Sequence, residues 1–196
     1  MPLPRPTPAL WLTLLLAAMV LVLGWFSSSA PNALELDRLR IAEGEWWRLL
    51  TGNLVHYGGY HLAMNLAALL VCGYLFFARC SVWFYSGLLL FSGLCVGLGV
   101  YLGTPEFAYY RGLSGVLHGL ITFGLLYSIR QTPWINGAGL VLVAGKLLHE
   151  QSETYQATDL QQLLPVPVVV DAHLYGAISG VIFAALYAAV HFRSSR

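Results

Sequence analysis

The stretch SVWFYSGLLLFSGLCVGLGVYLG, residues 81–103, decides the class of fold. It contains no charged side chain, and a helix needs about 20 such residues to cross the ~30 Å hydrocarbon core of a bilayer. Similar apolar runs recur along the chain. We therefore expect one all-α membrane domain over residues 1–196, with six transmembrane helices. They are expected near residues 9–27, 61–78, 81–103, 113–129, 133–149 and 172–192.

The overall composition supports a membrane protein. Hydrophobic residues make up 58% of the chain and charged residues 10%, whereas an ordinary soluble domain is about 25% charged. The few Lys and Arg residues are scattered, which argues against the clustered basic face of a nucleic-acid-binding protein. The three cysteines lie in or beside apolar runs without metal-ligand spacing. We expect no disulfide scaffold, no metal and no cofactor.

The arginines predict the orientation, because cytoplasmic segments of membrane proteins are enriched in Lys and Arg. If the N-terminus is cytoplasmic, the short inner segments hold Arg5, Arg79, Arg130, Arg193 and Arg196. The longer outer loops then hold Arg38, Arg40, Arg48 and Arg111. Both termini are therefore predicted to be cytoplasmic. The first apolar run also resembles a signal peptide, but its length and the prolines before it favour a retained helix.

Polar side chains inside the membrane are costly, so each one is a candidate for function. His61 and Asn65 are four residues apart and share a face of the second expected helix. Ser114 lies between glycines at the start of the fourth helix, and His173 lies near the start of the sixth. The predicted orientation places all four toward the outer leaflet.

A serine and a histidine that meet there suffice for nucleophilic catalysis, since the imidazole can take the hydroxyl proton while the oxygen attacks a carbonyl. His61, the Asn65 amide and the backbone N–H of Ser114 are candidate donors to the resulting oxyanion. We expect a Ser114–His173 dyad without a carboxylate.

The nearby carboxylates have other interpretations. Asp171 has the position of an N-cap of the last helix. Lys146, His149 and Glu150 are typical of an interfacial salt-bridge cluster at the end of the fifth helix. Gating of substrate access at this end of the helix is the alternative interpretation of the cluster.

Taken singly, the candidate site residues have plainer explanations. Ser114 can serve helix packing, His173 can be a hydrogen-bonded histidine inside the bundle, and Asn65 can link two helices. Gly176 and Gly180 form a small-xxx-small face that allows helices to approach closely. Only the combination of these residues is specific.

Four segments, in order along the chain, resemble the motifs of rhomboid proteases. They are Glu45–Thr51 with its Trp-Arg pair, His56–Asn65 as HxxxxHxxxN, Gly112–Gly115 as GxSG, and Ala172–Gly180 as AHxxGxxxG. The resemblance implies an intramembrane serine protease of six helices.

The same resemblance assigns roles to particular residues. It implies that Ser114 is the nucleophile, that His173 is the base, and that His61 and Asn65 are oxyanion donors. It also implies that Arg48 belongs to a structural network in the first loop.

Within that family, the short chain, the short loops and the segment Ser114–Gly119 are similar to the rhombosortases. The similarity implies a multi-pass protein of a bacterial inner membrane. Its substrate would be an exported protein with a Gly-Gly-containing C-terminal membrane anchor, cleaved near the outer face of the membrane. Whether acyl transfer to another amine follows cleavage is left open by the sequence.

The sequence departs from the rhomboid pattern four residues after the serine, where His118 replaces the usual aromatic residue. We expect its ring to pack against His173. A hydrogen bond to Ser114, or a role as an alternative base, are the other interpretations.

Two other functions compete with proteolysis as interpretations of this sequence. A catalytically silent rhomboid-like protein that binds transmembrane clients would not need Ser114, His173, His61 and Asn65 together. A small transporter or channel needs a polar path across the membrane, yet the inner halves of the expected helices are almost wholly apolar. A site open to one side of the membrane fits hydrolysis better.

Overall fold

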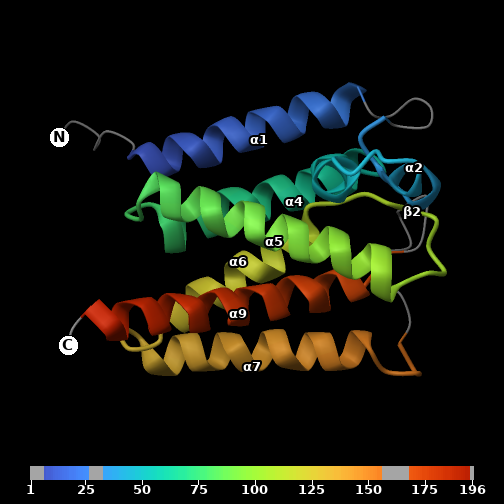
Figure 1. The fold of residues 1–196 in the computed structure, drawn as a ribbon. Coiled ribbons are helices and arrows are strands. Elements are labelled where there is room, and N and C mark those ends of the chain that lie inside the picture. Colours follow the sequence, from blue (N-terminus) through green and yellow to red (C-terminus); the bar gives the residue numbers. More distant parts are fainter. Residues whose placement is uncertain (1–6, 27–32, 156–167, 195–196) are drawn as a thin grey trace.

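A computed structural model describes residues 7–26, 33–155 and 168–194. A helix lies at each of the six expected ranges. They are α1 (Pro8–Phe26), α4 (Gly59–Cys72), α5 (Val82–Gly103), α6 (Ser114–Tyr127), α7 (Pro133–Glu150) and α9 (Asp171–Ser194). Figure 1 shows them as a bundle with α1 along one side, α7 along the opposite side, and α6 and α9 between.

Four segments among the described residues are long and apolar enough to cross a membrane. They are Pro8–Trp25, Gly59–Phe77, Val82–Gly103 and Asp171–Val190. The helix α6 is apolar but shorter, and α7 is not among the four. The chain is thus a mostly helical, multi-pass membrane protein, and the count of six spans stays a prediction.

Shorter elements join these helices. Before α4 the chain forms β1 (Leu36–Asp37), α2 (Arg38–Ala42), α3 (Arg48–Thr51) and the 3-10 helix η1 (Gly52–Leu54). The π-helical turn η2 (Gly73–Phe77) extends α4, and β2 (Tyr109–Tyr110) precedes α6.

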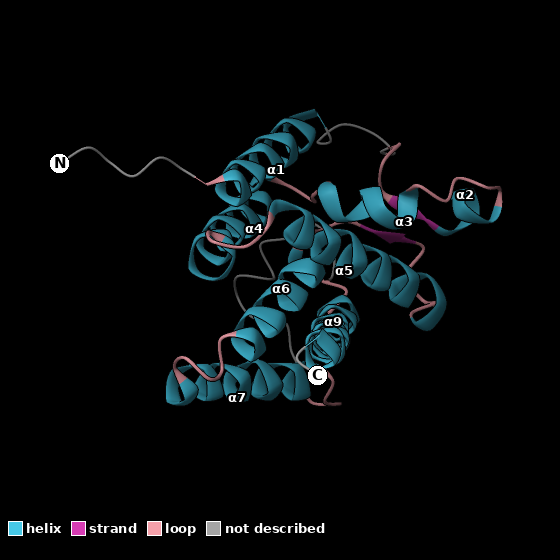
Figure 2. Ribbon diagram, turned by 60° about the vertical axis from the view of Figure 1, so that its left-hand side comes forward, coloured by secondary structure: helices cyan, strands magenta, loops and turns pink. Residues whose placement is uncertain are grey.

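The first loop is tied to the segment that leads into α6. The strands β1 and β2 pair antiparallel, with Leu36 opposite Tyr110, and Figure 2 shows them beside α2 and α3. The N–H of Gly112 also donates to the carbonyl of Gly52, at 3.1 Å. Buried Arg48 bonds the carboxylate of Glu45 at 2.6 Å and the carbonyl of Glu35 at 2.9 Å. These bonds fix the backbone two residues before Ser114.

The centre of the bundle is the contact between α6 and α9. A Cβ atom at Gly176 would overlap the carbonyl oxygen of Gly115, and one at Gly180 would overlap that of Gly119. Both glycines of the small-xxx-small face therefore lie against the backbone of α6, at the close approach expected for such a face. This packing brings the first turns of the two helices together.

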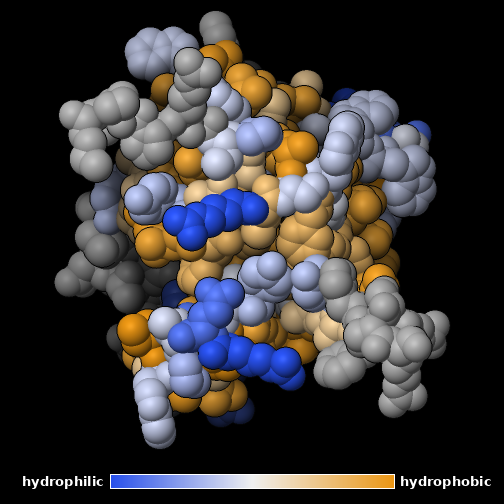
Figure 3. Space-filling model, turned by 90° about the vertical axis from the view of Figure 1, so that its left-hand side faces the viewer, coloured by the Kyte–Doolittle hydropathy of each residue, from blue (hydrophilic) through white to orange (hydrophobic). Residues whose placement is uncertain are grey.

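The two ends of the bundle differ. The beginning of α1 and the end of α9 lie at the same end (Figure 1). Figure 3 looks onto that end, where strongly hydrophilic side chains stand among apolar ones. Arg79 and Arg130, which follow η2 and α6, are exposed. Because α9 starts at Asp171 and crosses the bundle, His173 lies at the opposite end. Which end faces the cytoplasm stays a prediction.

Candidate active site

Ser114 and His173 meet where α6 and α9 begin. Ser114 is the first residue of α6, and His173 is the third residue of α9. The Nε2 atom of His173 lies 3.0 Å from the Oγ atom of Ser114, and the His173 side chain is buried. This is the geometry that a histidine needs to accept the serine proton.

The turn before Ser114 depends on glycine. Gly112 has φ +139°, a conformation that other residues rarely adopt, and a Cβ atom there would lie 2.7 Å from Cε1 of His61. Buried Tyr110 donates its hydroxyl to the carbonyl of Gly112 at 2.6 Å. The tight turn, held by Tyr110, thus presents Ser114 at the N-terminus of α6.

His118 lies one turn after the serine and stacks on His173. The ring centroids are 4.3 Å apart and the planes are inclined by 21°. The Nδ1 atom of His118 lies 2.7 Å from the backbone carbonyl of Ser114, so it carries the proton and donates it, because a carbonyl only accepts. The hydrogen bond of His118 therefore goes to the Ser114 backbone and leaves the hydroxyl to His173.

His61 and Asn65 stand on the first two turns of α4, beside the glycine turn. The His61 ring packs against Gly112. Buried Asn65 donates one amide hydrogen to the carbonyl of His61, at 2.9 Å. His61 thus contacts Gly112, which lies two residues before Ser114 in the chain. The oxyanion role of His61 and Asn65 stays a prediction.

A carboxylate contacts His173 on the side away from the serine. The two carboxylate oxygens of Glu150, the last residue of α7, lie 3.0 and 3.1 Å from Nδ1 of His173. The expectation that no carboxylate is well placed beside His173 was wrong, because the end of α7 lies against the start of α9. The catalytic dyad itself stays a prediction. Glu150 forms the expected salt bridge with Lys146, and its buried carboxylate also contacts His173.

Lys146, one turn before Glu150 on α7, also contacts this group of residues. Its Nζ atom lies 2.6 Å from the carboxylate of Glu150 and 3.3 Å from Nδ1 of His173. The ion pair with Glu150, four residues on, is the contact expected from the sequence. The sequence indicated that Lys146 and Glu150 form an ion pair. It did not indicate that the two side chains contact His173.

His56 is the first residue of the HxxxxHxxxN segment, but the sequence indicated no role for it. Its ring is buried and edge-on to that of His61, with centroids 5.0 Å apart. Burial, and then the neighbouring His61, lowers the pKa of His56 to about 3. The ring is therefore neutral at physiological pH, and its Nε2 atom accepts the N–H of Leu113 at 3.4 Å. His56 thus links the first loop to the residue before Ser114.

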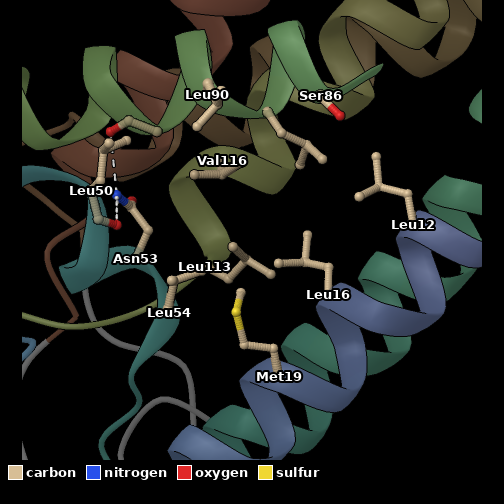
Figure 4. Close-up of a pocket in the computed structure, with 12 residues that line it drawn as sticks. Leu12, Leu16, Met19, Leu50, Asn53, Leu54, Ser86, Leu90, Leu113 and Val116 are labelled. Carbon is tan, nitrogen blue, oxygen red and sulfur yellow. Dashed lines mark hydrogen bonds between the residues drawn. The ribbon is translucent and has the colours of Figure 1, made fainter. Parts of the chain in front are cut away.

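An apolar cavity of about 300 Å³ lies on another side of the α6 N-terminus (Figure 4). It is lined by residues of α1, α3, η1, α5 and the start of α6, including Leu16, Leu50 and Leu113. Ser114 and His173 do not line it. Among the described residues, no group of three or more His, Cys, Asp or Glu side chains is arranged to hold a metal ion.

The fold and the site together define a class: a multi-pass helical membrane protein with a serine and a histidine in contact where two helices begin. The model of the rhomboid domain family matches residues 43–190, which include all of these site residues. The chain belongs to the rhomboid family.

Two proteins of Bacillus subtilis (strain 168) are similar to part of the chain. Rhomboid protease GluP is 37% identical over 89 residues, which cover 44% of this chain and 17% of GluP. "Putative rhomboid protease YdcA" is 34% identical over 87 residues, which cover 42% of this chain and 41% of that protein. The matched segments thus span less than half the length of either relative.

Proposed function

We propose that this protein is an intramembrane serine protease in which Ser114 is the nucleophile and His173 the general base. The observation that carries the proposal is the 3.0 Å contact between Nε2 of His173 and Oγ of Ser114 at the start of two packed helices. Membership of the rhomboid family supports it, as does the similarity to a rhomboid protease. A protein that only binds clients would not need this contact.

The reaction follows the usual course of serine catalysis. His173 takes the proton of the Ser114 hydroxyl while Oγ attacks the carbonyl carbon of the scissile peptide. The tetrahedral intermediate collapses as the imidazolium gives its proton to the leaving amine, and an acyl-enzyme remains. A water molecule, deprotonated by His173, then attacks the ester and releases the acid product and Ser114.

The oxyanion of that intermediate needs hydrogen-bond donors. Ser114 is the first residue of α6, and the first N–H groups of a helix have no partner within the helix and carry partial positive charge. We assign the donors to the Ser114 N–H and to the side chains of His61 and Asn65. The contact of the His61 ring with Gly112, two residues before Ser114, supports this assignment.

The substrate proposed here is an exported protein with a C-terminal transmembrane anchor that contains Gly-Gly. The chain would cut it near the outer face of a bacterial inner membrane. Two features support this choice: the short loops between helices and the segment Ser114–Gly119, which is similar to that of rhombosortases.

A fluorophosphonate probe, which labels activated serines, tests the chemistry on purified protein in detergent. Ser152→Ala is the control, because the Ser152 hydroxyl donates to the carbonyl of His149 within its own turn. We expect labelling of the wild type and of this control variant. We expect no labelling and no cleavage for Ser114→Ala at equal amounts of folded protein. Persistent cleavage by Ser114→Ala would falsify the protease proposal.

Two reporters test the substrate class. One carries a C-terminal Gly-Gly-containing anchor, and the other carries a transmembrane segment with the same flanks but with both glycines replaced by leucine. Cleavage of the first reporter alone is the expected result. Equal cleavage of both would overturn the proposed anchor while leaving the serine chemistry in place.

A further inference from the structure

We propose that Glu150 is the positioning residue of His173, so that the site is a Ser–His–Glu triad, and that Lys146 holds the Glu150 carboxylate in place. This inference rests on the proposed protease function and deepens it. It gives the C-terminal turn of α7 a part in the reaction, whereas the sequence pointed to a dyad.

The first argument is the burial of Glu150. Its side chain is 4% exposed, and a buried carboxylate is costly unless it is paired and hydrogen-bonded. Among the described residues, two groups bond it: the imidazole of His173, which lies on another helix, and the ammonium group of Lys146, whose side chain is 46% exposed. The carboxylate is therefore held between a solvated cation and the histidine that faces the serine.

The second argument is the proton on the imidazole. A neutral histidine carries one N–H, and the hydrogen bond at one ring nitrogen sets which nitrogen has it. An ionised carboxylate only accepts, so Glu150 at 3.0 Å requires the proton on Nδ1 of His173. The Nε2 atom then has a free lone pair toward Ser114, which is the form that can act as a base.

The third argument is that Lys146 favours the opposite form. An ammonium group only donates, and the Nζ atom of Lys146 lies 3.3 Å from Nδ1 of His173. Without the carboxylate, Lys146 can donate to a bare Nδ1, which moves the ring proton to Nε2. The imidazole would then donate toward Ser114 and could not take its proton. Glu150 prevents this by binding both groups.

The remaining neighbours of His173 do not replace Glu150. Ser114 contacts Nε2, and His118 stacks on the ring while its own Nδ1 is bonded to the Ser114 carbonyl. Within the described part of the chain, Glu150 is the carboxylate within hydrogen-bond distance of His173.

The kinetic test compares Glu150→Gln with Glu153→Gln, a matched change at an exposed carboxylate three residues on. Loss of the orienting carboxylate in a serine triad lowers kcat by on the order of 10²–10⁴-fold. We expect that loss for Glu150→Gln, with KM little changed, and wild-type kinetics for Glu153→Gln. Glu150→Asp, which keeps the charge on a shorter side chain, should recover part of the activity. Equal kcat for both glutamine variants at matched folded protein overturns the triad.

The double variant Glu150→Gln with Lys146→Met gives a sharper result. In the single variant, Lys146 orients the glutamine oxygen toward itself and leaves the amide donor facing His173. Removing the ammonium group lets the glutamine oxygen turn and accept from Nδ1. We therefore expect the double variant to be more active than Glu150→Gln alone. A double variant less active than the single one would contradict the role given to Lys146.

Nitrogen NMR tests the same point without any cleavage. In ¹⁵N-histidine-labelled Ser114→Ala protein, the His173 signals are identified by their loss on adding His173→Ala. We expect the Nδ1–H form, and a change to the Nε2–H form when Glu150→Gln is added. An unchanged form overturns the positioning role even if the protein is a protease. If the change from the Nδ1–H to the Nε2–H form is observed but the wild type cleaves no substrate, the proposed function is wrong and the positioning role stands.

Discussion

At the scale of single residues, His173 and His118 differ in what their nitrogens contact. His173 bonds Ser114 through Nε2 and Glu150 through Nδ1, whereas Nδ1 of His118 is bonded to a backbone carbonyl. A general base contributes about 10²–10⁴-fold to a rate. We predict that His173→Ala loses nearly all cleavage, while His118→Phe keeps most of it because a phenyl ring preserves the stacking on His173.

Cleavage and fluorophosphonate labelling of each variant, at equal amounts of folded protein, check this prediction. His149→Phe is the matched control, since His149 is exposed on α7 and should tolerate the same change. An inactive His118→Phe together with an active His173→Ala would mean that the base is His118.

The meeting of Ser114 and His173 could be predicted, because each is a polar side chain in an apolar run and lies in a segment that resembles a rhomboid motif. Glu150 could not be assigned to the site in the same way. Its partner His173 is 23 residues further along the chain, and its ion pair with Lys146 has the i, i+4 spacing of an ordinary exposed pair. Only the contact between the end of α7 and the start of α9 distinguishes a carboxylate beside His173 from an ordinary exposed ion pair.

At the scale of helices, the contact between α6 and α9 sets the distance between nucleophile and base. A Cβ atom at Gly176 would overlap the Gly115 carbonyl, so Gly176→Ala should push α9 away from α6. A misplacement of about 1 Å at a reacting centre can cost 10²-fold. We predict a lower thermal midpoint in detergent and at least that loss of probe labelling.

Gly145→Ala is the control for this prediction, because a Cβ atom at Gly145 meets nothing within 4 Å. It should leave both the midpoint and the labelling rate as in the wild type. If Gly176→Ala behaves in the same way as Gly145→Ala, then the close approach of the two helices does not govern the site.

The helices themselves could be predicted, since long apolar runs without charge have few alternatives in a membrane. The π-helical turn of η2 and the pairing of β1 with β2 could not. Gly73, where η2 begins, packs against Thr13 of α1, and each strand has two residues. Neither feature has a periodic pattern, because distant contacts create both of them.

At the scale of the whole molecule, the exposed Arg79 and Arg130 mark the end of the bundle that we predict to be cytoplasmic. Single cysteines at Gln131 and Glu153, both exposed, test this in a variant whose three native cysteines are replaced. A membrane-impermeant maleimide should label Glu153→Cys in intact spheroplasts. It should label Gln131→Cys only after the membrane is permeabilised. The reverse labelling pattern would invert the orientation.

The position of Glu150 on α7 has a consequence for the order of events during turnover. The helix α7 lies at one side of the bundle, as Figures 1 and 2 both show, and Glu150 at its end bonds His173 on α9. Because Glu150 and Lys146 both lie on α7, any outward displacement of that helix separates both from His173 and leaves Nδ1 of the imidazole to solvent. If the proposed triad is correct, Ser114 would be least reactive while α7 is displaced and most reactive once it has returned. A substrate that entered beside α7 would then be admitted before its peptide bond could be attacked.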